Sequence, residues 1–174
     1  MMVNFVEDLP LIREYIAERV HAQSQIEQPI SAIEVGFQLC QAGILVLNFD
    51  LREKHDRDGE WTRALDGPVL ELPQWWEAYE SAEEHGIEFI LPTGESCRLP
   101  PAAGDEMVAG KFGEALLSIA LDAIAKHTFD SLNLREDCQL DIEEFDGMWA
   151  WPLSYEEVGR TNMIRNLAAV RLPG

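Results

Sequence analysis

One group of residues whose spacing could serve chemistry is a set of four carboxylates in a short stretch of chain: Glu77, Glu80, Glu83 and Glu84. On a helix, Glu77, Glu80 and Glu84 recur at i, i+3 and i+7 and form a stripe of like charge along one flank. Repulsion within such a stripe costs stability. The stripe is therefore either a solvated helix face or a binding site for a basic partner.

A second group of carboxylates surrounds a stretch that alternates like a β-strand. It consists of Asp137, Asp141, Glu143, Glu144 and Asp146. The alternation breaks at Glu144, and the group is either a solvated sheet edge or a second site for a basic partner. Asp141 and Glu143 would share one face of the strand and could work as an acid–base pair. A chain with 32 acidic residues forms such pairs by chance.

Tryptophans accompany both acidic groups. Trp75 and Trp76 are adjacent in a predicted helix, about 100° apart around its axis, so at most one of them points squarely into the core. Trp149 and Trp151 share one face of an extended segment beside the second group. A tryptophan beside carboxylates can anchor an interface, and burial beneath the C-terminal tail is the alternative. We count Trp149 and Trp151, with the nine acids, as candidate partner-binding residues.

The sequence lacks the signatures of catalytic and metal sites. Its histidines are scattered: His21, His55, His85 and His127. None has a second histidine or a cysteine at the spacing of a zinc site. Oxygen ligands cluster in residues 55–60. A calcium loop starting at Asp56 would need a glycine at its sixth position and an acid at its twelfth, but the chain has Trp61 and Gly67 there. We expect no catalytic residue, no metal and no cofactor.

The charge balance restricts the partners of the chain. Its 174 residues carry a formal net charge of −19, and a field of that sign repels nucleic acid and anionic membranes while speeding encounter with a basic surface. Cys40, Cys97 and Cys138 are odd in number and form no CxxC pair, as is typical of reduced thiols. The acidic first residues and the lack of a long apolar run predict neither a secretory signal nor a membrane-spanning stretch. We expect a cytoplasmic protein with a basic protein partner.

Four helices are predicted, and they would position the first acidic group and the core. They cover residues 10–25, a short stretch at 73–85, the longest at 105–127 and a final short stretch at 155–159. Apolar periodicity predicts the first and third of these helices. Pro73 suits the first helical position and Gly86 the C-terminal cap of the second. Gly110 and Gly113 each cost the third helix about 1 kcal/mol relative to alanine, so we expect close packing against a strand or another helix there.

Six strands are predicted by alternation and turn signals: residues 30–40, 44–49, 87–91, 96–99, 138–145 and 148–151. Gly43 supplies the turn of a hairpin between the first two strands, and the first of them should show a polar face to water. Short turns between consecutive strands favour an antiparallel or mixed sheet of four to six strands, with helices packed on one face. The sequence therefore predicts a single α+β domain over residues 1–174.

The end of the chain differs in charge from the rest. Residues 160–174 carry Arg160, Arg165 and Arg171 and follow the last acid, Glu157. A basic tail on so acidic a body should dock onto it. Docking can take place within one subunit or across a homodimer.

In size, acidity, α+β pattern and lack of catalytic motifs, with acidic stretches at 77–84 and 137–146, the chain resembles the small acidic immunity proteins of bacterial toxin systems. Those proteins neutralise a toxin, often a basic nuclease, by covering its active surface. The resemblance implies a protein-binding module. One alternative is a DNA mimic, whose carboxylates imitate phosphates. Another is an enzyme with a small substrate, which needs a pocket that gathers histidine, cysteine and carboxylates.

Overall fold

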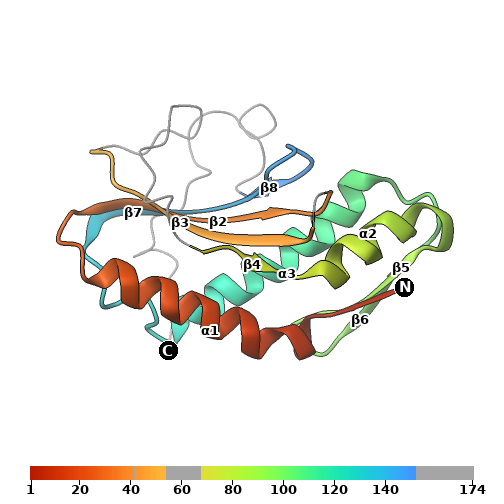
Figure 1. The fold of residues 1–174 in the computed structure, drawn as a ribbon, viewed down its shortest axis with the longest axis horizontal. Coiled ribbons are helices and arrows are strands. Elements are labelled where there is room, and N and C mark those ends of the chain that lie inside the picture. The colour runs from red at the N-terminus through yellow and green to blue at the C-terminus, as the bar shows by residue number, and fades with distance from the viewer. Residues whose placement is uncertain (41, 54–67, 152–174) are drawn as a thin grey trace.

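The computed structural model describes residues 1–40, 42–53 and 68–151, and Figure 1 shows their arrangement. The helices and strands of this part of the chain are, in order, β1 (Met2–Asn4), α1 (Phe5–Ser24), β2 (Ile30–Gln38), β3 (Ile44–Asp50), β4 (Leu70–Glu71), α2 (Pro73–His85), β5 (Ile87–Ile90), β6 (Ser96–Leu99), α3 (Asp105–Ala125), β7 (Leu134–Glu144) and β8 (Ala150–Trp151). The chain has an α+β fold, as the sequence predicts.

The larger sheet has five strands in the order β4-β3-β2-β7-β8. β2 and β3 form the predicted antiparallel hairpin, whereas β2 and β7 run parallel with Glu34 beside Asp141 and Val35 beside Ile142. The sheet is therefore mixed. A parallel neighbour requires a long crossover connection, and here the connection between β2 and β7 includes α2 and α3.

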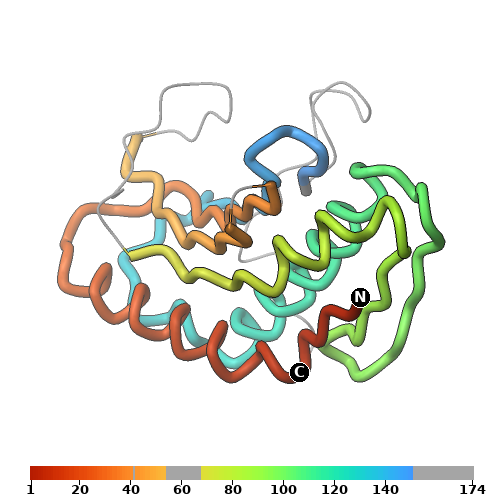
Figure 2. The backbone as a smooth tube through the Cα atoms, turned by 45° about the vertical axis from the view of Figure 1, so that its right-hand side comes forward, coloured from red at the N-terminus to blue at the C-terminus, as the bar shows by residue number. Residues whose placement is uncertain are grey.

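The smaller sheet has three strands in the order β1-β5-β6, so the predicted strands divide between two sheets instead of forming one. Val3 of β1 lies beside Phe89 of β5 in parallel register. Figure 2 shows this sheet beside α2, at the end of the molecule that holds the N-terminus. The sequence does not indicate β1, because three residues are too few for a period and the partner strand lies more than 80 residues away.

All three helices cover the same face of the five-stranded sheet, as Figure 1 shows. Aromatic rings join the layers: Phe112 of α3 lies 5.7 Å from Phe5, 5.1 Å from Trp75 and 5.4 Å from Phe89, measured between ring centroids. Such edge-to-face contacts each contribute about 0.5–1.5 kcal/mol beyond burial of their area. The predicted packing of the helices on one face is confirmed.

The starts of α1 and β7 differ most from the prediction, by four residues or more, whereas the other predicted boundaries in the described part of the chain differ by at most two residues. α1 begins at Phe5 instead of residue 10, because the side chain of Asn4 caps it by accepting from the N–H groups of Val6 (3.1 Å) and Glu7 (3.4 Å). β7 begins at Leu134, four residues before the predicted start, where its pairing with Ile30 sets the boundary. The predicted helix at 155–159, the tail at 160–174 and the oxygen-rich segment at 55–60 lie outside the described residues.

The outer edge of β3 is covered largely by side chains of α1. β4 pairs only with Ile44 and Leu45. Further along β3, the N–H of Leu47 donates to the hydroxyl of Tyr15 (3.0 Å), and its carbonyl accepts from Nε and Nη2 of Arg19 (3.4 and 3.3 Å). The buried peptide groups of Leu47 are thus satisfied without a neighbouring strand, which also blunts an edge that could otherwise pair with another chain.

Candidate functional site

Helix α2 turns the first acidic group toward solvent. Pro73 opens the helix, Gly86 ends it with φ of 70°, and Trp75, Ala78 and Ala82 form the buried stripe at i, i+3 and i+7. The ring of Trp75 is fully buried, and its Nε1 donates to Oδ2 of Asp8 at 2.8 Å. The remaining side of α2 therefore faces water, and it carries the four predicted acids.

The exposed side of α2 combines an aromatic ring with carboxylates that have no lysine or arginine partner in the described chain. We call it the α2 surface, and it consists of Trp76, Glu77, Glu80, Glu83 and Glu84, all of which are exposed. Within the described part of the chain, no lysine or arginine forms an ion pair with Glu77, Glu80 or Glu83, and Glu84 lies 3.8 Å from the imidazole of the exposed His85. Trp76 is 40% exposed, one turn from Glu80. Of the two adjacent tryptophans, one points inward and one outward, as predicted.

Tyr79 links the α2 surface to two other elements. Its hydroxyl donates to Sδ of Met148 in the β7–β8 connection at 3.6 Å. Burial raises the pKa of Tyr79, and the Cys40 thiol and the Asp105 carboxylate beside it raise the pKa further. The pKa of the Cys40 thiol is raised mainly by burial, and the nearby Asp146 carboxylate raises it further. The start of α3 and the β7–β8 turn therefore bring Asp105 and Asp146 to the margin of the α2 surface.

The second predicted group does not form one surface. Asp137 lies near the start of β7, exposed and 3.3 Å from Nε of Arg135. Asp141 and Glu143 point to the sheet face opposite the helices, and Asp141 is fully buried. Glu144 is also fully buried, at the inward position that follows Leu140 and Ile142. Only Asp137 and Asp146 of this group are exposed.

A row of polar side chains that the sequence did not identify crosses the middle of the large sheet. Nδ2 of Asn48 on β3 donates to Oε1 of Glu34 on β2 at 2.7 Å, and Glu34 lies in register with Asp141 on β7. All three are buried, as is β2 from Ile30 to Phe37, so the prediction that this strand shows a polar face to water is wrong. Alternation places Glu34 on this face but carries no information on whether the face is covered.

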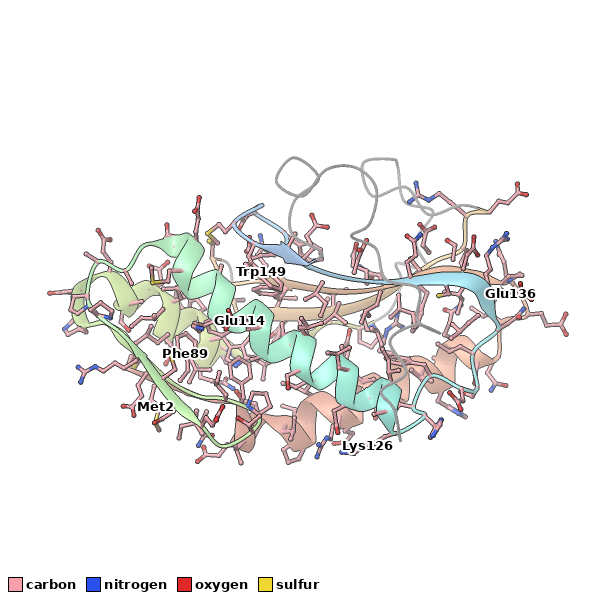
Figure 3. The ribbon with its side chains drawn as sticks, turned by 180° about the vertical axis from the view of Figure 1, so that it is seen from behind. Met2, Phe89, Glu114, Lys126, Glu136 and Trp149 are labelled. Atoms are coloured by element: carbon pink, nitrogen blue, oxygen red, sulfur yellow. The ribbon has the colours of Figure 1, made fainter. Side chains whose placement is uncertain are left out.

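Trp149 is half-buried and packs against the core. A Cβ on Gly113 of α3 would collide with its indole ring, a Cβ on Gly110 would lie at ordinary contact distance from that ring (3.5 Å), and Phe37 lies 6.4 Å away between ring centroids. Figure 3 shows Trp149 beside α3. The close packing predicted at the two glycines is confirmed, but the prediction that a strand or another helix supplies it is wrong, because the contacting side chain is Trp149 of the β7–β8 turn. Trp151 pairs through its backbone with Ile142, while its side chain lies outside the described residues.

No described group of histidine, cysteine and carboxylate side chains has the geometry of a metal site. All three cysteines are free thiols, and burial raises the pKa of Cys138 to about 12, which keeps it protonated. A cleft of about 190 Å³ between α1 and α3 is lined partly by Arg13 and Asp122, which form an ion pair at 3.0 Å, and its lining includes no histidine or cysteine. It is not the gathered pocket that an enzyme would need.

No protein-family model matches this chain, no curated protein is significantly similar to it in sequence and no solved structure is significantly similar to it in fold. Among the described residues, every helix is too short or too polar to cross a membrane.

Proposed function

We propose that this protein is an acidic protein-binding module that covers a basic surface of its partner, in the manner of an immunity protein that neutralises a toxin. The observation that supports this function is Trp76, 40% exposed among four carboxylates that have no lysine or arginine partner in the described chain. The three free cysteines are consistent with the cytoplasmic location that we assign to it.

The composition of the α2 surface suits an arginine or lysine side chain of the partner. A cation over an indole ring gains about 0.5–1 kcal/mol at an exposed site and more once water is excluded. The carboxylates of Glu80 and Glu83 lie one and two turns along the helix from Trp76, where they could accept hydrogen bonds from the same cation or from its neighbours. Asp105 and Asp146 add charge at the margin, which mainly speeds association.

A matched pair of charge reversals tests the surface. Glu80→Lys/Glu84→Lys changes two acids of α2 that are four residues apart, and Glu14→Lys/Glu18→Lys changes two exposed acids of α1 with the same spacing. Both variants change the net charge by four units. The partner is first isolated with the wild-type protein from a native lysate and identified by mass spectrometry, and the affinity of each variant for the purified partner is then measured by titration calorimetry.

We expect the α2 variant and Trp76→Ala each to weaken binding at least tenfold, and the α1 variant to weaken it about twofold through the loss of long-range attraction. Equal losses for the two charge reversals would refute the α2 surface as the binding site. A partner that is itself a DNA-binding protein, displaced by duplex DNA, would instead favour a DNA mimic. Turnover of a small molecule, unaffected by either variant, would favour an enzyme.

A further inference from the structure

Glu144 closes the turn between β7 and β8 around its own side chain. Its backbone N–H donates to the carbonyl of Trp149 (2.8 Å), and its carbonyl accepts from the N–H of Gly147 (3.0 Å). Its Oε2 accepts from the N–H groups of Asp146 (2.7 Å) and Met148 (3.4 Å). One side chain thus holds the backbone of the turn that joins the two strands.

The other carboxylate oxygen of Glu144 has no such role. Glu144 is fully buried, and its Oε1 makes no hydrogen bond of normal geometry, although the N–H of Leu39 lies close enough to the carboxylate to lower its pKa slightly. No lysine or arginine of the described chain pairs with this carboxylate. A buried, ionised carboxylate without a cation is costly, and the usual relief is to bind a proton.

The turn connects Glu144 to both neighbouring helices. Trp149 packs against Gly113 of α3, and Sδ of Met148 accepts from the hydroxyl of Tyr79 on α2. Asp146 makes a long contact of 3.5 Å with Nε2 of Gln38 at the end of β2. Any loosening of the turn therefore frees an aromatic ring from α3 and a thioether from α2.

We propose that Glu144 is a proton-operated latch: the neutral carboxyl holds the β7–β8 turn closed against α2 and α3, and ionisation loosens it. Titratable groups face this region from every neighbouring element: Cys40 after β2, Tyr79 on α2, Asp105 on α3 and Asp146 in the turn. The Asp146 carboxylate beside Glu144 disfavours a negative charge there and so adds to the rise in the pKa of Glu144 that burial causes. Cys40 and Tyr79 have raised pKa values and stay neutral there.

The direction of the pH effect follows from burial, which raises the pKa of Glu144. A carboxyl whose pKa is higher in the closed state than in the open state takes up a proton on closing. Closure is therefore most favourable below the pKa of an open, solvated glutamate, about 4.3, and weakens as the pH rises through the raised value. Each unit by which closure raises the pKa of Glu144 corresponds to about a tenfold change in the equilibrium constant between the open and closed turn.

The latch also bears on partner binding, and this part of the inference rests on the proposed function. Asp146 and Met148 lie at the margin of the α2 surface, so an open turn would alter the shape of that margin. Acidic conditions should fix the margin in the closed arrangement described above.

Hydrogen exchange of the isolated protein tests the latch without any partner, so its outcome is independent of the proposed function. Peptides covering residues 144–151 are followed between pH 5 and pH 8, with exchange times corrected for the intrinsic pH dependence of amide exchange. The wild type is compared with Glu144→Gln, a neutral side chain of the same shape, and with Asp137→Asn, which neutralises an exposed acid of the same strand.

In the wild type and in Asp137→Asn, we expect protection of residues 144–151 to fall at least several-fold as the pH rises, whereas in Glu144→Gln it should not vary with pH. The same pH slope in Glu144→Gln as in the wild type would overturn the latch. If Glu144→Gln does not fold, a carbon-13 NMR titration of the Glu144 carboxyl in the wild type decides: a pKa above 5 supports the latch, and one at or below 4.5 overturns it.

Discussion

At the scale of single residues, the Trp149 side chain determines how much space is left at two glycines of α3. Gly110 and Gly113 lie on the same side of the helix, and both face Trp149. Trp149 leaves room for a methyl group at Gly110 but none at Gly113. The helical pattern of the sequence indicates that something packs there. Only the fold identifies a tryptophan from a turn more than 30 residues later.

The two glycines give opposite predictions for the same substitution. Gly110→Ala should stabilise the protein by about 0.5–1 kcal/mol, because alanine restricts the unfolded chain and favours the helix. Gly113→Ala gains the same propensity but displaces the indole ring, so it should destabilise by about 1–3 kcal/mol. Urea denaturation followed by circular dichroism measures both. Similar effects of the two substitutions would mean that Trp149 does not pack on Gly113.

At the scale of the elements, the edge of β3 depends on two side chains of α1. Tyr15 and Arg19 satisfy the N–H and the carbonyl of Leu47 and thereby take the place of a neighbouring strand. The guanidinium of Arg19 also lies 5.9 Å from the ring centroid of Phe49. Helix packing and sheet termination are therefore coupled at this edge.

Removing one hydroxyl should expose this coupling. Tyr15→Phe leaves the buried N–H of Leu47 without an acceptor, and we expect a loss of about 1–3 kcal/mol of unfolding free energy. Tyr79→Phe is the matched control, because that hydroxyl is half-buried and its bond to Sδ of Met148 is weak. For Tyr79→Phe we expect a loss of less than about 1 kcal/mol of unfolding free energy. A melting temperature that falls equally in both variants would contradict the role of Tyr15.

The sequence predicts the elements that carry their own local signals. The boundaries of α2 agree with the prediction because Pro73 and Gly86 mark its ends, and the same holds for β6 before Pro100. β4 has two residues and no period, and the parallel pairing of β2 with β7 joins residues about 100 positions apart. Such contacts depend on how the whole chain packs, which local patterns do not record.

In the candidate site, too, the features with a local sequence signal can be predicted and those that depend on long-range packing cannot. The acids of α2 and the outward position of one tryptophan can be predicted from helical spacing alone. Burial of Glu144 cannot, because it depends on the turn folding back over its carboxylate. The sequence does show that the alternation of polar and apolar residues breaks at Glu144. In the structure this break marks an acid that faces inward, and it does not extend an acidic edge of the sheet.

At the scale of the whole molecule, electrostatics is dominated by the excess of acids. The chain has 32 acidic and 13 basic residues, and the ion pairs of the described residues include several that lie largely in water, such as Lys126 with Asp122. Exposed pairs of this kind contribute about 0–1 kcal/mol each. Self-repulsion should therefore outweigh attraction across the surface.

Added salt should consequently stabilise the protein. Screening shortens the Debye length from about 10 Å at 0.1 M salt to about 3 Å at 1 M, which weakens repulsion between carboxylates that are not in contact, including those of the α2 surface. We expect the melting temperature to rise between 0.1 and about 0.5 M sodium chloride.

A charge variant tests the same repulsion. Glu80→Lys/Glu84→Lys reduces the magnitude of the net charge, from −19 to −15, because each substitution replaces one negative with one positive charge. That variant should melt higher at low salt and respond less to added salt. A wild-type melting temperature that falls across the series would show that attractive pairs outweigh the repulsion.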